Sequence, residues 1–241
     1  MQDKIVFDNR AVYIPSIDTL VLSDIHLGFT DWEGADFPTG EYDAILERLD
    51  NLLLKHAPET VAIAGDVFHR FNRPPEDALA TLQRITSLID DYDSNLVVTP
   101  GNHDTYKFES DMFFDGTSTE IYDTGDGIVV LHGHELPDSF LPDAELYIIG
   151  HLHPTVTIQS KKRPAYLYGE DVFNDSDVLV LPSFSEVPPG TPFRAGDNPS
   201  VNAPLIKQGS SLDSYNVIVW DEDGGESLDF PTLKELDTHL G

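Results

Sequence analysis

Hydrophobic and polar positions in the first hundred residues follow two different periods. Short apolar runs rich in β-branched residues lie at 11–16, 19–24, 60–66 and 95–100. The segments 41–57 and 74–92 instead repeat apolar residues at helical spacing, and the second begins with Pro74 and Pro75 before acidic residues, which is typical of a helix start. An opening strand pair followed by strand–helix–strand–helix–strand order predicts an α/β fold with a largely parallel sheet.

After residue 115 the helical period fades and short apolar runs dominate. They lie at 120–124, 127–133, 145–151, 155–160, 164–169, 178–183 and 216–223, and they predict a second, mostly antiparallel sheet. Residues 185–211 are crowded with Pro, Gly, Ser and Asn, which predicts a long loop that edges the site. Because no repeat or linker interrupts the chain, we expect residues 1–241 to form one compact domain.

Almost all histidines of the chain lie beside Asp or Asn in five short blocks. These are SDIHLGF at 23–29, AGDVFHRF at 64–71, PGNHD at 100–104, LHGHE at 131–135 and IIGHLHP at 148–154. Each block follows an apolar run, so its polar residues stand where a strand ends, the usual place of α/β active sites. Histidine, aspartate and asparagine together are the ligand set of a two-metal hydrolytic site.

Taken singly, each block also has a structural explanation. Asp24 and His26 could share a metal, or be a surface acid and a histidine satisfied by the fold. Asp66 could bridge two ions, although Gly-Asp after a strand is common. The pairs His132–His134 and His151–His153 could equally be features of loops. Five such blocks at strand ends in one chain nevertheless favour the metal site.

The PGNHD block carries the most specific chemistry. Asn102 offers a neutral carbonyl ligand, His103 a titratable imidazole, and Asp104 a carboxylate that could orient that imidazole.

Composition narrows the chemistry further. The chain has no cysteine, which excludes disulfides and thiolate metal sites and leaves ligands suited to Mn, Mg, Fe or Zn. The N-terminal residues lack an apolar signal region, and no stretch approaches the roughly 18 apolar residues of a membrane span, so we expect a cytoplasmic protein without membrane association.

A formal net charge of −29 comes from carboxylates scattered along the chain. This pattern favours a halophilic, archaeal protein whose acidic surface is solvated in a salt-rich cytoplasm. Such a surface repels nucleic acid at low salt. At molar salt the screening length falls to roughly 3 Å, so the charge does not exclude a nuclease.

The order D-x-H, G-D, G-N-H-D, H-G-H, G-H-x-H resembles the calcineurin-like metallophosphoesterases over nearly the whole chain. The resemblance implies a four-layer αββα sandwich with mixed sheets and two metal ions at the strand ends. It assigns the first metal to Asp24, His26, Asp66 and His153. It assigns the second to Asp66, Asn102, His132 and His151. Mn²⁺ is the cofactor that the family favours, with Fe, Zn or Mg as alternatives.

In such a site two cations polarise a phosphate and activate a water molecule, and the resulting hydroxide attacks phosphorus in line with the leaving oxygen. His103, oriented by Asp104, would act as the general acid on that oxygen, a role worth about 10²–10⁴ in rate.

The longer strings point to a subtype. SDIHLGF and AGDVFHRFNRPP resemble the nuclease subunit of DNA double-strand-break repair in archaea and bacteria, where the histidine corresponding to His69 lies near the scissile phosphate. GHLHP and VLPSFSEVPPG resemble more closely the ICC-like phosphoesterases, including the DNA-ligase-associated kind. From the length of the chain we expect neither the capping domain nor the ATPase-binding helices of the repair nuclease, and a ligase or ATPase partner is a hypothesis.

Several residues could contact substrate, each with a structural alternative. Arg70 and Arg73 could clamp flanking phosphates or pair with surface acids, and His69 could contact substrate or cap its loop. Phe29 and Trp32 could stack on a base, although a rim or core position is the simpler interpretation. Residues 161–163, the only basic run, are expected in a solvated hairpin turn.

Three functions follow. A metal-dependent phosphodiesterase acting on DNA or RNA is favoured, and hydrolysis of nucleotides, cyclic nucleotides or phosphomonoesters is the alternative. A non-catalytic scaffold is disfavoured because every expected ligand is present.

Overall fold

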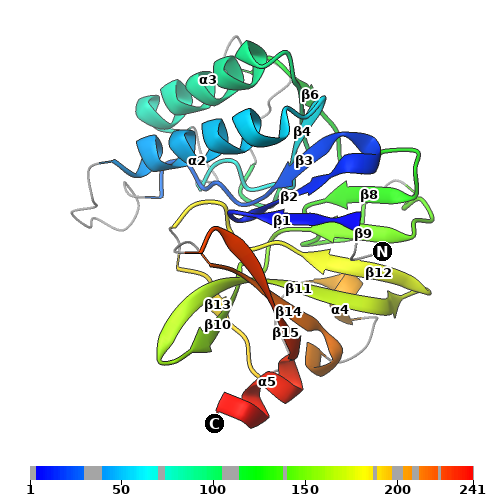
Figure 1. The fold of residues 1–241 in the computed structure, drawn as a ribbon. Coiled ribbons are helices and arrows are strands. Elements are labelled where there is room, and N and C mark those ends of the chain that lie inside the picture. Colours follow the sequence, from blue (N-terminus) through cyan, green and yellow to red (C-terminus); the bar gives the residue numbers. More distant parts are fainter. Residues whose placement is uncertain are drawn as a thin grey trace.

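The computed structural model describes residues 4–29, 40–69, 74–104, 114–137, 140–186, 189–196, 203–207, 212–221 and 224–240. These residues form two facing β-sheets with helices on both outer faces (Figure 1). Within this part of the chain, no helix is both long and apolar enough to cross a membrane.

The first sheet has the order β1–β2–β3–β4–β5–β6. Its strands are β1 (Val6–Asp8), β2 (Ala11–Ile14), β3 (Thr19–Leu22), β4 (Thr60–Ile63), β5 (Asn95–Val98) and β6 (Thr117–Ser118). Strands β3 to β6 are parallel, while β1, β2 and β3 pair antiparallel. The predicted strand pair and parallel sheet are confirmed. Sequence analysis missed β1, whose three residues are too few for a periodic signal.

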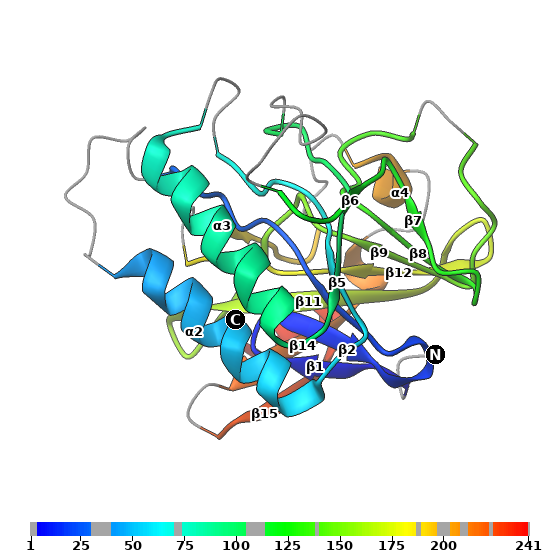
Figure 2. The ribbon, with the colours of Figure 1, turned by 90° about the horizontal axis from the view of Figure 1, so that it is seen from above.

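Two long helices cover the outer face of this sheet (Figures 1 and 2). They are α2 (Glu41–His56) and α3 (Glu76–Asp91), within two residues of the predicted segments, and a 3-10 turn (Pro15–Ile17) links β2 to β3. Helix α2 ends at Ala57, whose left-handed backbone terminates the helix, and α3 starts after Pro75 with Glu76 and Asp77 in its first turn. The apolar helix faces and the sheet enclose one buried cluster.

The second sheet runs β13–β10–β11–β12–β9–β8–β7, with β14 paired to β11 and β15 to β14. Its strands are β7 (Tyr122–Asp123), β8 (Ile128–Leu131), β9 (Leu146–Ile149), β10 (Pro154–Ile158), β11 (Lys161–Phe173), β12 (Ser176–Val180), β13 (Thr191–Pro192), β14 (Asn216–Asp221) and β15 (Glu226–Thr232). Strands β8, β9 and β12 are parallel, and β13 joins β10 in parallel. The other pairs are antiparallel, so the sheet is mixed around a parallel centre.

The inner faces of the two sheets pack against each other through a second buried cluster. Tyr166 on β11 is fully buried there and donates a hydrogen bond from its hydroxyl to the Ala11 carbonyl oxygen on β2, at 2.9 Å. On the far face, α4 (Pro204–Lys207), a 3-10 turn (Leu212–Ser214) and α5 (Leu233–Leu240) cover a third cluster. The layers are therefore helix, sheet, sheet, helix (Figure 1).

Two expectations from the sequence are corrected. The expected loop 185–211 contains β13 and α4. Phe193, which follows β13, and Leu205 and Ile206 of α4 are buried because they cover the apolar outer face of the second sheet. Residues 161–163 are not in the hairpin turn: Gln159 and Ser160 make it with positive φ values of 49° and 62°, and the basic run begins β11.

Candidate active site

Loops from both sheets meet at one edge of the sandwich. Asp24, Asp66 and Asn102 follow the parallel strands β3, β4 and β5, whereas His132 and His151 follow β8 and β9. The first two loops continue to pair beyond their strands, since His26 N donates to Asp66 O at 2.9 Å. Backbone hydrogen bonds thus hold the first two loops of the site together beyond the ends of their strands.

Five of the predicted ligands have left-handed backbone conformations. The φ values are 55° at Asp24, 52° at His26, 49° at Asp66, 67° at His151 and 43° at His153. Such conformations cost L-residues about 1–2 kcal/mol each. Strain of this kind gathers at functional sites, where the surrounding structure holds it.

The first group of side chains contains Asp24, His26, Asp66 and His153. One ligand atom from each lies within 4.8 Å of the others. His153 Nε2 is 3.0 Å from Asp24 Oδ1 and 3.1 Å from His26 Nε2, and His26 Nε2 is 3.8 Å from Asp66 Oδ2. All four are buried or nearly so. This spacing suits one ion between two carboxylates and two imidazoles.

The second group contains Asp66 again, with His132 and His151. His132 Nε2 lies 3.4 Å from Asp66 Oδ2 and 3.2 Å from Asn102 Oδ1. Its Nδ1 donates to the Ala64 carbonyl oxygen at 3.0 Å, which leaves Nε2 as the ligand atom. Asp66 Oδ2 therefore faces both groups, which is where a bridging carboxylate stands.

The buried carboxylates of Asp24 and Asp66 need nearby positive charge to stay ionised. Burial would raise the pKa of Asp66, but the hydrogen bond and charge of His132 hold that pKa below its ordinary range. Burial would lower the pKa of His132, but the same bond and the charges of Asp66 and Asp24 raise it to about 9. In the absence of a cation, a proton on His132 therefore supplies part of the positive charge that the carboxylates demand.

His26 and His151 fit neutral ligands, whereas the charge of Asp24 and its hydrogen bond raise the pKa of His153 against the effect of burial. Burial, with His153 nearby, lowers the pKa of His26 to about 3, and burial, with His132 nearby, lowers that of His151 to about 4. His151 Nε2 is buried and has no hydrogen-bond partner among the described residues. This unpaired imidazole nitrogen lies beside Asp66 and His132, and its lone pair could bind a divalent cation. The residues present therefore fit two metal ions.

His69 and His103 lie together beside the first group. Their rings stack with centroids 5.1 Å apart, and His69 Nδ1 is 3.4 Å from His26 Nδ1. His103 Nδ1 donates to the His69 carbonyl oxygen at 2.7 Å, and the His103 backbone N–H donates to Asp66 Oδ1 at 2.9 Å. The loop after β5 thus binds the bridging carboxylate through a backbone N–H, and its His103 ring lies edge-on to the His26 ring, with centroids 5.4 Å apart.

Asp104 does something different from what its sequence position predicted. Its Oδ1 accepts the Phe68 N–H at 2.9 Å, and its Oδ2 accepts those of Gly101 and Val67 at 3.0 and 3.2 Å. The buried carboxylate therefore ties the loop after β4 to the loop after β5. The partner of His103 Nδ1 is the His69 carbonyl, so the expectation that Asp104 orients this ring is wrong.

Sequence analysis also missed two serines after β12. The hydroxyls of Ser183 and Ser185 lie 2.8 and 3.4 Å from the Asp24 carbonyl oxygen, to which they donate. Both are buried and support the strained backbone at Asp24. The signal was present, because PSFS follows the apolar run VLVL as the metal blocks follow theirs.

Of the other candidate residues, the structure describes Phe29 and His134 and leaves three outside its described part. Phe29 packs edge-on against His69, with ring centroids 4.5 Å apart, at the margin of the site. Trp32, Arg70 and Arg73 lie outside the described residues, and the proposed arginine clamp stays a prediction. His134, beside His132, contacts Glu135 at 3.1 Å and belongs to neither ligand group.

Comparison with known proteins decides the family. The model of the family described as calcineurin-like phosphoesterase matches residues 17–198, more than half of the chain. The chain belongs to the calcineurin-like phosphoesterase family. It is accordingly a hydrolase acting on phosphoester bonds, from a family that uses a binuclear metal centre, and the two groups sharing Asp66 are the candidate centre.

One solved structure shares this phosphoesterase fold. Nuclease MPE from Pseudomonas putida aligns with a TM-score of 0.65 at 19% identity, covering 92% of this chain and 92% of its own. The phosphoesterase Yfce from E. coli is 16% identical, with a TM-score of 0.42, and covers 89% of this chain and 98% of its own. No curated protein matches this calcineurin-like phosphoesterase by sequence.

Proposed function

We propose that this phosphoesterase is a metal-dependent nuclease that hydrolyses phosphodiester bonds of DNA or RNA. One observation carries the proposal: two groups of ligand atoms share Asp66 Oδ2, and the His103 imidazole lies next to them. Asp24, His26, Asp66 and His153 would hold one cation. Asp66, Asn102, His132 and His151 would hold the other, with Mn²⁺ as the proposed native metal.

When bound, the two cations supply Lewis acidity that neutralises a phosphate and acidifies a water molecule. The protein supplies the geometry. Asp66 keeps the two groups adjacent, and the Ala64 carbonyl holds the His132 ring in the tautomer that presents Nε2.

His103 would donate a proton from Nε2 to the leaving oxygen. Its Nδ1–H donates to the His69 carbonyl oxygen, which fixes the orientation of the ring and leaves Nε2 for this role. His69, stacked on this ring, is proposed to contact the substrate phosphate.

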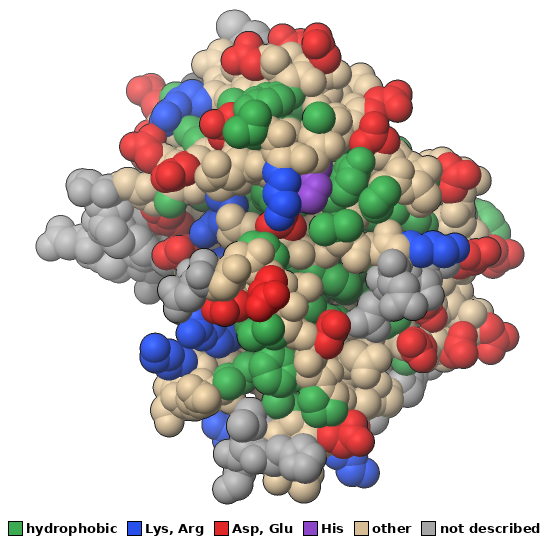
Figure 3. Space-filling model, in the orientation of Figure 1, with side chains coloured by type: hydrophobic (Ala, Val, Ile, Leu, Met, Phe, Trp, Pro, Cys, Tyr) green, Lys and Arg blue, Asp and Glu red, His purple; other side chains and the backbone are tan. Residues whose placement is uncertain are grey.

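A nucleic acid substrate is supported by the fold shared with a protein whose name is nuclease MPE, covering 92% of each chain. Against it stands the acidic surface, which Figure 3 shows spread over the visible face. The charge of −29 disfavours polyanions only where salt is low, because screening at molar salt confines repulsion to roughly 3 Å.

The test is cleavage of 5′-labelled single- and double-stranded DNA and RNA at molar KCl, with Mn²⁺, Mg²⁺, Fe²⁺ or Zn²⁺ supplied in parallel. His103→Ala should lose about 10²–10⁴ in turnover while still binding metal. His56→Gln is the matched control, since His56 lies at the C-terminal end of α2 and bonds to Asp8, away from the site. Turnover of small phosphoesters without any nucleic acid product would contradict the nuclease and favour the small-substrate alternative. A ligase or ATPase partner stays a separate hypothesis.

A further inference from the structure

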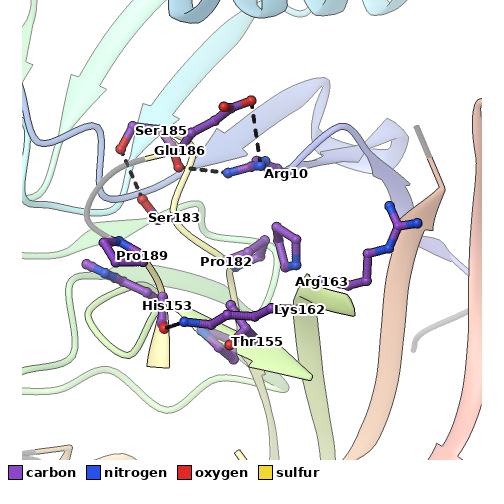
Figure 4. A pocket seen from close by; sticks show the side chains of 13 residues that line it. Arg10, His153, Thr155, Lys162, Arg163, Pro182, Ser183, Ser185, Glu186 and Pro189 are labelled. Atoms are coloured by element: carbon purple, nitrogen blue, oxygen red, sulfur yellow. Dashed lines mark hydrogen bonds and ion pairs between the residues drawn. The ribbon is translucent and has the colours of Figure 1, made fainter. Parts of the chain in front are cut away.

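A cavity of about 350 Å³ adjoins the first ligand group on the side of His153 (Figure 4). We call it the basic pocket and define it by Arg10 from the β1–β2 turn, His153, Thr155 on β10, Lys162 on β11, and Glu186 after β12. His153 belongs to both places, because its ring lines the pocket while its Nε2 is 3.0 Å from Asp24 Oδ1. A group bound in the pocket would therefore be the immediate neighbour of a phosphate at the metal site.

The charge of this pocket is the opposite of the charge of the chain. The protein has 14 basic and 43 acidic residues, yet Arg10, Lys162 and Arg163 line one cavity. Its one carboxylate, Glu186, lies 3.4 Å from Arg48 Nη2 and 4.0 Å from Arg10 Nη2. Figure 4 shows the Arg163 guanidinium at the end of the pocket away from His153, which leaves Arg10 and Lys162 as its positively charged side chains of interest.

Backbone carbonyl oxygens hold the Arg10 and Lys162 side chains in place. Arg10 Nη1 donates to the Ser185 carbonyl oxygen at 2.8 Å, and Lys162 Nζ donates to that of Gly190. This bond directs the Lys162 side chain toward His153, as Figure 4 shows. Because an ammonium has three N–H donors, the bond to Gly190 leaves further N–H groups for a ligand. A pre-positioned cation loses less conformational freedom on binding an anion than a mobile one.

Charged donors of this kind suit a phosphate group. Arginine and lysine side chains bind phosphate oxygens through charge-assisted hydrogen bonds. Thr155 Oγ1, in the same wall, is itself buried and exposes almost no surface to the cavity, so Arg10 and Lys162 are the donors that a phosphate would meet.

We infer that the basic pocket binds a second phosphate of the substrate, the one adjoining the scissile phosphodiester. The inference rests on the proposed function and deepens it, since it names substrates with at least two neighbouring phosphates, such as oligonucleotides, over those with one. Among the described residues, the pocket offers a nucleic acid backbone positive charge next to the metal site.

The experiment compares a dinucleotide with one phosphodiester and a trinucleotide with two, at molar KCl and saturating Mn²⁺. In wild type, kcat/KM should be higher for the trinucleotide. Lys162→Gln keeps a donor for Gly190 but removes the charge, and should lower the trinucleotide-to-dinucleotide ratio about tenfold. Lys162→Arg should restore it.

Lys161→Gln is the matched control. Lys161 is exposed, stands next to Lys162 on the same strand, and does not line the pocket. It removes the same charge, so an equal fall in the ratio would show a general field effect and would overturn the pocket assignment.

Binding is measured separately from cleavage by fluorescence anisotropy of a labelled tetrathymidylate with the full chain in EDTA. Lys162→Gln should weaken binding about tenfold relative to wild type and Lys161→Gln. Equal Kd values together with equal ratios would refute the pocket. If wild type hydrolyses bis(p-nitrophenyl) phosphate but no nucleotide, the proposed function fails, and the anisotropy result alone decides the pocket.

Discussion

Gly101→Ala tests whether close backbone packing positions the bridging carboxylate. A Cβ at Gly101 would overlap Asp66 Oδ1 and lie 2.6 Å from Asp66 N and 2.8 Å from Asp66 Cγ. Ordinary contact begins at 3.4 Å, so the backbone of the loops after β4 and β5 must separate by about 0.8 Å at Asp66 N, and Asp66 Oδ1 must move further. That movement breaks the 2.9 Å bond from His103 N to Asp66 Oδ1 and displaces Oδ2 from His132.

The expected cost is about 1–3 kcal/mol in the free energy of unfolding, as for overpacking in a core. A displacement near 1 Å at a reacting centre costs about 10²-fold in rate, so kcat/KM on bis(p-nitrophenyl) phosphate should fall by about that factor. Mn²⁺ affinity, measured by titration calorimetry, should fall as well.

Gly125→Ala is the control for adding a methyl group. Gly125 has a φ of +78° and no atom within 4 Å of its added Cβ, so its substitution costs about 1 kcal/mol through the backbone alone. Metal affinity and turnover of this variant should match wild type. If Gly101→Ala also kept both within about threefold of wild type, the argument from close packing would be refuted.

Three further results are expected. His132, with a pKa of about 9, must lose its proton to bind metal, so the Mn²⁺ affinity of the metal-free protein should rise up to about tenfold per pH unit from pH 6.5 to 8.5. Calorimetry in buffers of different ionisation enthalpy should detect a released proton. The absence of that proton at pH 7.5 would contradict this assignment. Tyr166→Phe removes a buried bond between the sheets and should cost about 1 kcal/mol in urea unfolding, whereas Tyr92→Phe, whose hydroxyl bonds Asp50 on the surface, should cost little. Since a charge of −29 repels itself, the melting temperature should rise as KCl increases from 0.1 to 3 M, and a flat profile would argue against a halophilic protein.

Much of the fold was predictable because its signals are local. The periods of 2 and 3.6 residues located α2, α3 and most strands, and the polar blocks after apolar runs named the residues around Asp66. The short β1, and β13 and α4 inside a Pro- and Gly-rich segment, carry no such period. Their places depend on the sheets that they extend or cover.

The roles of individual side chains divide in the same way. Sequence determined which chemistry the protein carries: histidine, aspartate and asparagine at strand ends, without thiols, in the order of a phosphoesterase. Tertiary structure decided which atoms meet. In the folded chain, Asp104 accepts hydrogen bonds from three backbone N–H groups, and the Ser183 hydroxyl donates to the Asp24 carbonyl oxygen. Arg10 and Lys162 line the same cavity. The physical reason is that periodicity and propensity act over a few residues, whereas these contacts join segments that lie up to about 160 positions apart in the chain.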